Sequence, residues 1–188
     1  MAGFTFNEVT LNHPSLYYAL QLLASLRKPQ HYLEVGVREG DSLKIVVEAA
    51  LSSLQKLVLC DDWGGGYGGT ARGSHQHVAE LLTSWGYTHE VQWVDGDSHQ
   101  VLRPAIEGQT FDLILIDGDH SEAGARQDLM DVYSSLAPQG LLLFDDVYFA
   151  SHPWLTDVLH KFVQEMPYLE LLAEMTDSAS GVAVVRGA

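Results

Sequence analysis

Short apolar runs alternate in this chain with segments whose apolar residues recur every three or four positions, and no other feature constrains the fold as strongly. The runs predict five strands, at residues 32–35, 57–60, 91–94, 113–116 and 141–144. The segments between them predict amphipathic helices. The later runs are unbroken, as expected when helices cover both faces of a parallel sheet. The alternation therefore predicts an α/β fold built from βαβ units.

The helices are predicted from their apolar spacing. The buried faces are expected within residues 43–54, 78–85, 129–136 and 155–166, and an N-terminal helix begins near Asn12 and Pro14 and runs toward Arg27. Four serines stand where N-caps are needed. They are Ser42, Ser74, Ser98 and Ser121. Residues 168–175 and 182–186, joined by a short turn, predict an antiparallel pair of strands that finishes the sheet.

Length and charge exclude several classes of protein. With 188 residues, the chain is predicted to form one domain over 1–188, with a helical extension at about 1–29. Ten Lys and Arg against 25 Asp and Glu give a net charge of −15, so a nucleic-acid backbone would be repelled. The single cysteine and an N-terminus without a signal-peptide pattern predict a cytoplasmic protein with no membrane partner.

A glycine turn follows the first predicted strand and leads into a helix. Its pattern includes Glu34, Gly36, Gly40 and Ser42, and a turn of this kind lets a nucleotide-like ligand approach the backbone. The dinucleotide fingerprint Gly-x-Gly-x-x-Gly is absent, because Arg38 stands where a glycine is required. An NAD-dependent oxidoreductase is therefore the alternative, and a plain strand-to-helix turn is the simplest explanation.

Carboxylates also follow the second and third strands. Asp61, about 20 residues beyond the glycine turn and close to Trp63, is placed to accept both hydroxyls of a ribose. Asp97 and Ser98 follow the third strand, where Asp97 is placed to accept the amino group of adenine. Helix capping alone would explain Ser98 equally well.

The fourth and fifth strands end in the sequences Asp117-Gly-Asp-His120 and Asp145-Asp146. Neighbouring parallel strands lie about 5 Å apart, so Asp117, Asp145 and Asp146 are expected to face one point. A divalent cation, Mg²⁺ above all, would relieve their mutual repulsion. Asx turns and helix caps are the alternative explanation. His120, whose ordinary pKa is near 6.5, is the histidine best placed to act as a general base.

These motifs in this order resemble the class I S-adenosylmethionine-dependent methyltransferases, and within them the small, metal-dependent O-methyltransferases that include catechol-type and antibiotic-sugar or polyketide-tailoring enzymes. The resemblance covers the chain from about Gln30 onward. It implies a Rossmann-like, doubly wound sheet of seven strands in the order 3-2-1-4-5-7-6. It also implies a set of cofactor-binding residues: Glu34, Gly36, Gly40, Ser42, Asp61, Trp63, Asp97, Ser98 and Asp117.

The expected function is methyl transfer from S-adenosylmethionine to a hydroxyl oxygen of a small-molecule acceptor, with a divalent metal and His120 as base. A non-catalytic adenosyl-binding domain of the same fold is a further alternative. The glycine-rich loop from Gly64 to Gly73 is interpreted either as a lid or as a flexible connector. The sequence identifies neither the acceptor nor the oligomeric state, and a homo-oligomer stays open.

Overall fold

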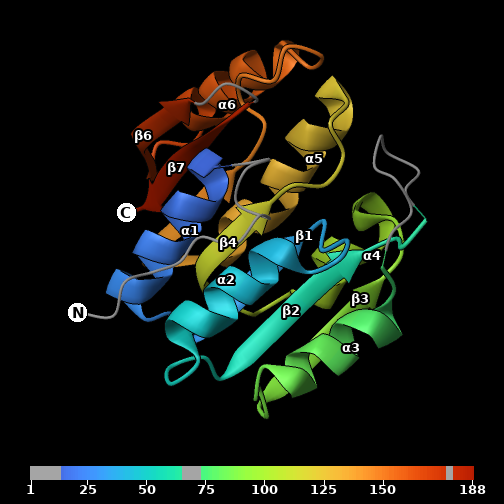
Figure 1. The fold of residues 1–188 in the computed structure, drawn as a ribbon. Helices are drawn as coiled ribbons and strands as arrows, with labels where there is room; N and C mark the ends of the chain where they lie inside the picture. The colour runs from blue at the N-terminus through green and yellow to red at the C-terminus, as the bar shows by residue number, and fades with distance from the viewer. Residues whose placement is uncertain (1–13, 65–72, 177–179) are drawn as a thin grey trace.

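The computed structural model describes residues 14–64, 73–176 and 180–188, and these form a seven-stranded sheet with helices on both faces (Figure 1). The strand order is β3-β2-β1-β4-β5-β7-β6, as the resemblance implied. The strands are β1 His31–Val35, β2 Lys56–Asp61, β3 Glu90–Asp95, β4 Phe111–Ile116, β5 Leu136–Phe144, β6 Leu169–Thr176 and β7 Gly181–Gly187. The first five pair in parallel, and β7 pairs antiparallel with both β5 and β6.

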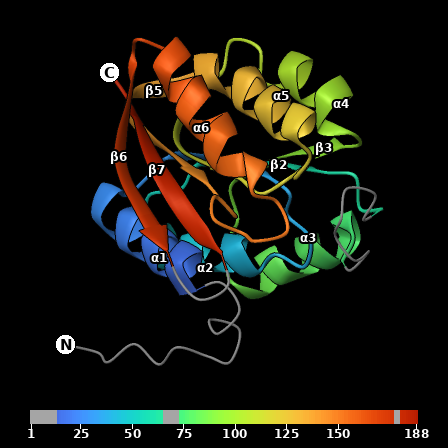
Figure 2. The ribbon, with the colours of Figure 1, turned by 90° about the horizontal axis from the view of Figure 1, so that it is seen from above.

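Helices pack on the sheet in two layers (Figure 2). One layer holds α1 Pro14–Arg27, α2 Asp41–Ala50 and α3 His75–Ser84. The other holds α4 Ser98–Ala105, α5 Glu122–Val132 and α6 Trp154–Glu165. Each layer encloses its own apolar core, because strand residues such as Leu57 and Val58 point alternately to the two faces. Sheet and layers thereby fix the carboxyl ends of the parallel strands as one rigid edge.

Three local predictions are wrong. Gly40, not Ser42, precedes α2, and its carbonyl accepts the amide of Lys44 at 2.9 Å. Asp97, not Ser98, caps α4, because its carboxylate lies one residue earlier and accepts the amide of His99. Ser74 and Ser121 do cap their helices.

The third error concerns the end of α5. Leu136 was expected on a helix, but α5 ends at Val132, a short 3-10 turn follows at Tyr133–Ser135, and Leu136 already belongs to β5. The Pro-Gln-Gly sequence that follows suggests a turn. Instead, Gln139 adopts φ 61° inside the strand, and the pairing with β4 shifts between Phe111 and Leu113. An irregularity of this kind leaves no trace in apolar periodicity.

Candidate active site

The sheet hydrogen bonding continues one residue beyond the ends of the parallel strands and aligns the predicted site residues along one edge. The amide of Gly36 donates to the carbonyl of Cys60 at 2.9 Å, and the amide of Gly96 donates to that of Asp61 at 2.9 Å. On the other side, the amide of Asp117 donates to Val35 and the amide of Asp145 to Ile116. The glycine turn and the acidic strand ends therefore share one backbone framework.

The glycine turn is shaped by Asp61. Its Oδ2 accepts the amides of Val37 and Arg38, both at 2.8 Å, and its Oδ1 accepts the amide of Trp63 at 2.6 Å. Gly36 and Gly40 adopt φ 87° and 83°, a region that residues with a β-carbon rarely enter. Asp61, predicted as a ribose ligand, thus has a second task, because it holds the turn that a cofactor would approach.

Glu34 and Ser42 form a buried pair beneath the turn. The Ser42 hydroxyl donates to Oε1 of Glu34, while Oε2 has no hydrogen-bond partner among the described residues. Burial raises the pKa of Glu34 to about 8, although the hydrogen bonds from Ser42 and Tyr32 lower it. Glu34 therefore keeps its proton at neutral pH and acts as an uncharged floor of the turn.

The third strand end is also hydrogen-bonded. Gln100 donates its side-chain amide to Asp97 at 2.8 Å, in addition to the cap that Asp97 provides. The Ser98 hydroxyl donates to Oδ1 of Asp128 at 2.6 Å, and Nε1 of Trp63 donates to Asp95 at 2.9 Å. Asp97, Ser98 and Trp63 lie beside the glycine turn as predicted, but each already contacts a neighbouring group.

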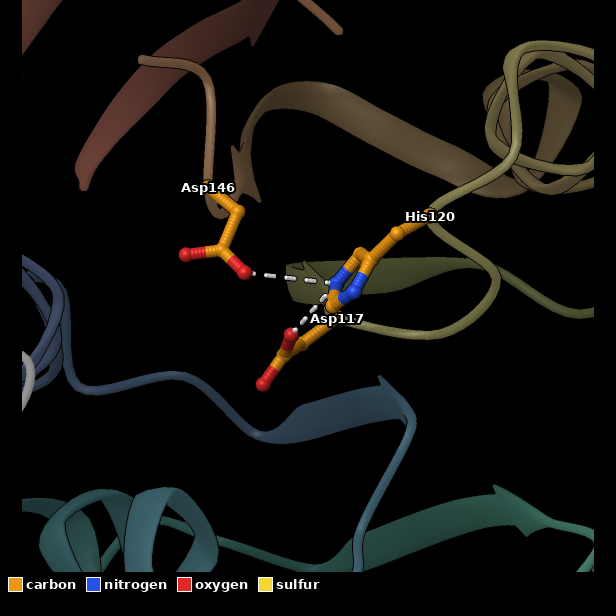
Figure 3. Close-up of side chains that lie close together, drawn as sticks. All are labelled: Asp117, His120 and Asp146. Atoms are coloured by element: carbon orange, nitrogen blue, oxygen red, sulfur yellow. Dashed lines mark hydrogen bonds and ion pairs between the residues drawn. The ribbon is translucent and has the colours of Figure 1, made fainter. Parts of the chain in front are cut away.

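Asp117, His120 and Asp146 come together at the fourth and fifth strand ends (Figure 3). Nε2 of His120 lies 3.2 Å from Oδ1 of Asp117 and 3.5 Å from Oδ2 of Asp146. One ligand atom from each residue lies within 4.8 Å of the others. Asp146 adopts φ 57°, an unusual backbone conformation of the kind that often occurs at functional sites. This group brings together two carboxylates and one imidazole.

The acidic strand ends do not serve as helix caps. Residue Pro153 precedes α6, so neither Asp145 nor Asp146 caps it. Asp119 does form an Asx turn, since its Oδ1 accepts the amide of Ser121 at 2.8 Å. Asp145 is buried beside Asp146 but is not part of the three-residue group, and its role as a metal ligand stays a prediction.

His120 is held by its surroundings. Burial lowers its pKa, but the hydrogen bond to Asp117 and the charges of Asp117, Asp146 and Asp119 outweigh burial and leave the pKa above its ordinary value. Nε1 of Trp154 donates to the backbone carbonyl of His120 at 2.7 Å, and the ring of His152 lies 5.1 Å from the His120 ring. The imidazole is therefore fixed at the carboxylates that it faces.

Sequence reasoning missed the groups that support this site. His152 and Trp154 belong to the segment that follows β5, and Asp128 lies in the middle of α5. Asp128 is completely buried, yet its sequence position looks like any polar residue of a helix. The predicted lid cannot be assessed, because residues 65–72 lie outside the described ranges. No helix among the described residues is long and apolar enough to cross a membrane.

The sequence over residues 33–147 matches the model of a family described as "Methyltransferase domain". The match covers more than half of the chain, and its limits enclose the glycine turn and all of the acidic strand ends. The chain therefore belongs to this methyltransferase family, which favours methyl transfer over the NAD-dependent alternative. A search of curated proteins finds no match.

Solved structures share the fold at low sequence identity. An O-methyltransferase from Bacillus cereus in complex with SAH has a TM-score of 0.68 at 16% identity, with 95% of this chain and 82% of that chain covered. TomG from Streptomyces achromogenes, an O-methyltransferase of tomaymycin synthesis in complex with SAM, has a TM-score of 0.70 at 18% identity, covering 93% and 79%. The N-methyltransferase NodS from Bradyrhizobium japonicum, in complex with SAH, has a TM-score of 0.65 at 16% identity, covering 94% and 88%. The same fold thus serves both oxygen and nitrogen acceptors.

Proposed function

We propose that this protein transfers a methyl group from S-adenosylmethionine to a hydroxyl oxygen of a small-molecule acceptor. The observation that carries the proposal is the group of Asp117, His120 and Asp146 beside the glycine turn. An amine is nucleophilic as its free base, whereas a hydroxyl must lose a proton as it is methylated. A group that combines an imidazole with carboxylates serves the second reaction.

The cofactor site is proposed along the edge from Gly36 to Ser98. Family membership supports it, as do the SAM and SAH held by the structures of similar fold. The open backbone at Gly36 and Gly40 admits the methionine end. Asp61 and Asp97 are the carboxylates proposed for the ribose and the adenine, the first while it keeps the glycine turn in shape.

The donor set suits a hard divalent cation such as Mg²⁺, because carboxylate oxygens dominate it. Asp117 and Asp146 would hold the ion, with Asp145 as the neighbouring third carboxylate. A bound cation supplies positive charge that lowers the pKa of an acceptor hydroxyl.

His120 is proposed as the general base. Its Nε2 faces the carboxylates of Asp117 and Asp146, so an acceptor hydroxyl placed at this group is within reach of the imidazole. Trp154 fixes the backbone of His120 and thereby limits the directions in which the ring can point. The neutral imidazole takes the acceptor proton as the methyl group arrives.

The test uses acceptors in matched pairs that differ only in a hydroxyl or an amine. The protein is incubated with trideuteromethyl-labelled S-adenosylmethionine and Mg²⁺, and products are identified by mass spectrometry. Label is expected on the hydroxyl members only, and excess EDTA is expected to abolish it. Labelling of amines alone would overturn the proposed acceptor class, and labelling that persists in EDTA would remove the metal.

A further inference from the structure

We infer that Asp128 is a positioning residue that makes the binding of the cofactor and of the divalent cation interdependent. The inference rests on the proposed function, but it concerns a residue that touches neither ligand. Asp128 lies in α5, between the edge proposed for the adenosyl group and the loop that carries Asp117 and His120.

The Asp128 carboxylate connects two separate parts of the site. Its Oδ1 accepts the hydroxyl of Ser98 at 2.6 Å, at the first residue of α4. Its Oδ2 accepts the backbone amide of Asp119 at 3.3 Å, in the loop between β4 and α5. Ser98 is 21 residues from Asp119 in the sequence, and Asp128 brings the two within reach of one side chain.

His99 completes the network. Its Nε2 lies 3.5 Å from Oδ1 of Asp128 and 3.9 Å from Oδ2 of Asp119, and its Nδ1 lies 3.5 Å from Oδ1 of Asp97. Asp128 is 0% exposed, and a buried carboxylate is costly unless hydrogen bonds or a cation compensate it. Burial raises the pKa of Asp128, whereas the Ser98 hydrogen bond and the His99 charge lower it. The network therefore maintains a charged group where an apolar residue would pack at less cost.

The loop that Asp128 holds is clamped from its other side as well. A β-carbon on Gly118 would lie 2.8 Å from Oδ2 of Asp128 and 3.1 Å from Cγ1 of Val35. The backbone at Gly118 is thus confined between the strand that leads into the glycine turn and the Asp128 carboxylate. A ligand that shifts Ser98 or the glycine turn must also shift this loop, with Asp117 before Gly118 and His120 after it.

The coupling is measured by calorimetry of S-adenosylhomocysteine binding to the full chain, in EDTA and in saturating Mn²⁺. In the wild type, Mn²⁺ is expected to tighten S-adenosylhomocysteine binding about five- to tenfold. By thermodynamic reciprocity, S-adenosylhomocysteine should tighten Mn²⁺ binding by the same factor. In Asp128→Asn both factors should fall below about twofold, because one acceptor oxygen of the bridge becomes a donor.

Asp131 provides a matched control. It lies one turn further along the same helix, is 3% exposed, and accepts a hydrogen bond from Gln127 at 2.9 Å, far from either end of the bridge. Asp131→Asn should keep the wild-type coupling factor. Ser98→Ala is the second bridge variant. It removes only the α4 contact, so it should lose the coupling even if Asp128→Asn does not fold.

The outcomes separate the two proposals. If the wild type binds no S-adenosylhomocysteine, the proposed function fails, and the coupling fails with it. If the wild type binds both ligands independently, or if Ser98→Ala keeps the wild-type factor, the coupling is wrong while the proposed function stands. A loss of coupling in Asp131→Asn equal to that in the bridge variants would reduce Asp128 to a general packing residue and overturn its assignment.

Discussion

The backbone carbonyl of Asp117 occupies the space into which a side chain on Gly36 would project. A β-carbon built on Gly36 overlaps that carbonyl oxygen, and Gly36 also adopts φ 87°. The residue that opens the glycine turn is thus in contact with the residue that leads the acidic group. Two motifs about 80 residues apart in the sequence therefore form one site.

Replacing Gly36 by alanine should be far more damaging than the backbone conformation alone explains. Gly86 offers a matched control, because its φ is 79° and a β-carbon there meets nothing within 4 Å. Gly86→Ala should cost about 1 kcal/mol of unfolding free energy, from strain alone. Gly36→Ala should cost about 3 kcal/mol or more, since overlap adds to strain. Urea unfolding measures both, and equal losses would show that the contact with Asp117 relaxes freely.

Asp61 should affect both stability and cofactor affinity. Asp61→Asn leaves fewer acceptors for the amides of Val37, Arg38 and Trp63, so the unfolding free energy should fall by about 1–3 kcal/mol and S-adenosylhomocysteine should bind more weakly. Asp62, exposed and bonded only locally to the amide of Gly64 among the printed contacts of its carboxylate, is the comparison. Asp62→Asn should change stability by no more than about 0.5 kcal/mol. A purely ribose-binding Asp61 would lose affinity at unchanged stability.

The buried carboxyl of Glu34 should make the cofactor-free protein less stable as the pH rises. The folded state keeps the Glu34 proton up to a pKa of about 8, whereas the unfolded chain releases it near 4.5. Between these values the folded state binds more protons, so this group makes stability fall with pH, by at most about 1.4 kcal/mol per pH unit. Glu34→Gln removes the titration and keeps an uncharged side chain of similar shape.

Unfolding of the wild type and of Glu34→Gln is compared from pH 5 to pH 8, which cancels the titration of the other acidic groups. The stability of the variant relative to the wild type should increase steadily over this range. A constant difference would mean that Glu34 is ionised in the folded state and that Ser42 stabilises its charge.

The sequence predicted the strands and the edge where the site lies, because apolar periodicity and strand ends are local features. It also predicted Asp117, Asp146 and His120 as neighbours, since adjacent parallel strands must end together. It could not predict Asp128, whose burial arises only when α4 packs beside α5 across the sheet. The misplaced caps have a similar cause, because Ser42 and Ser98 donate their hydroxyls to distant carboxylates rather than capping their own helices.

His120 as a base and His120 as a metal ligand give different results, because its Nε2 faces the same carboxylates that would hold a cation. If it is the base, His120→Gln should retain Mn²⁺ affinity within about threefold of the wild type while kcat falls roughly 10²- to 10⁴-fold. Asp146→Asn should instead weaken Mn²⁺ binding at least about tenfold, and Asp145→Asn tests whether the neighbouring carboxylate contributes. His160, which pairs with Glu174 at 2.8 Å outside this group, supplies the control variant His160→Gln, with both properties unchanged. Mn²⁺ affinity is measured by electron paramagnetic resonance and kcat on the acceptor found by mass spectrometry. A loss of Mn²⁺ binding in His120→Gln equal to that in Asp146→Asn would make the imidazole a ligand and leave proton removal to one of the carboxylates.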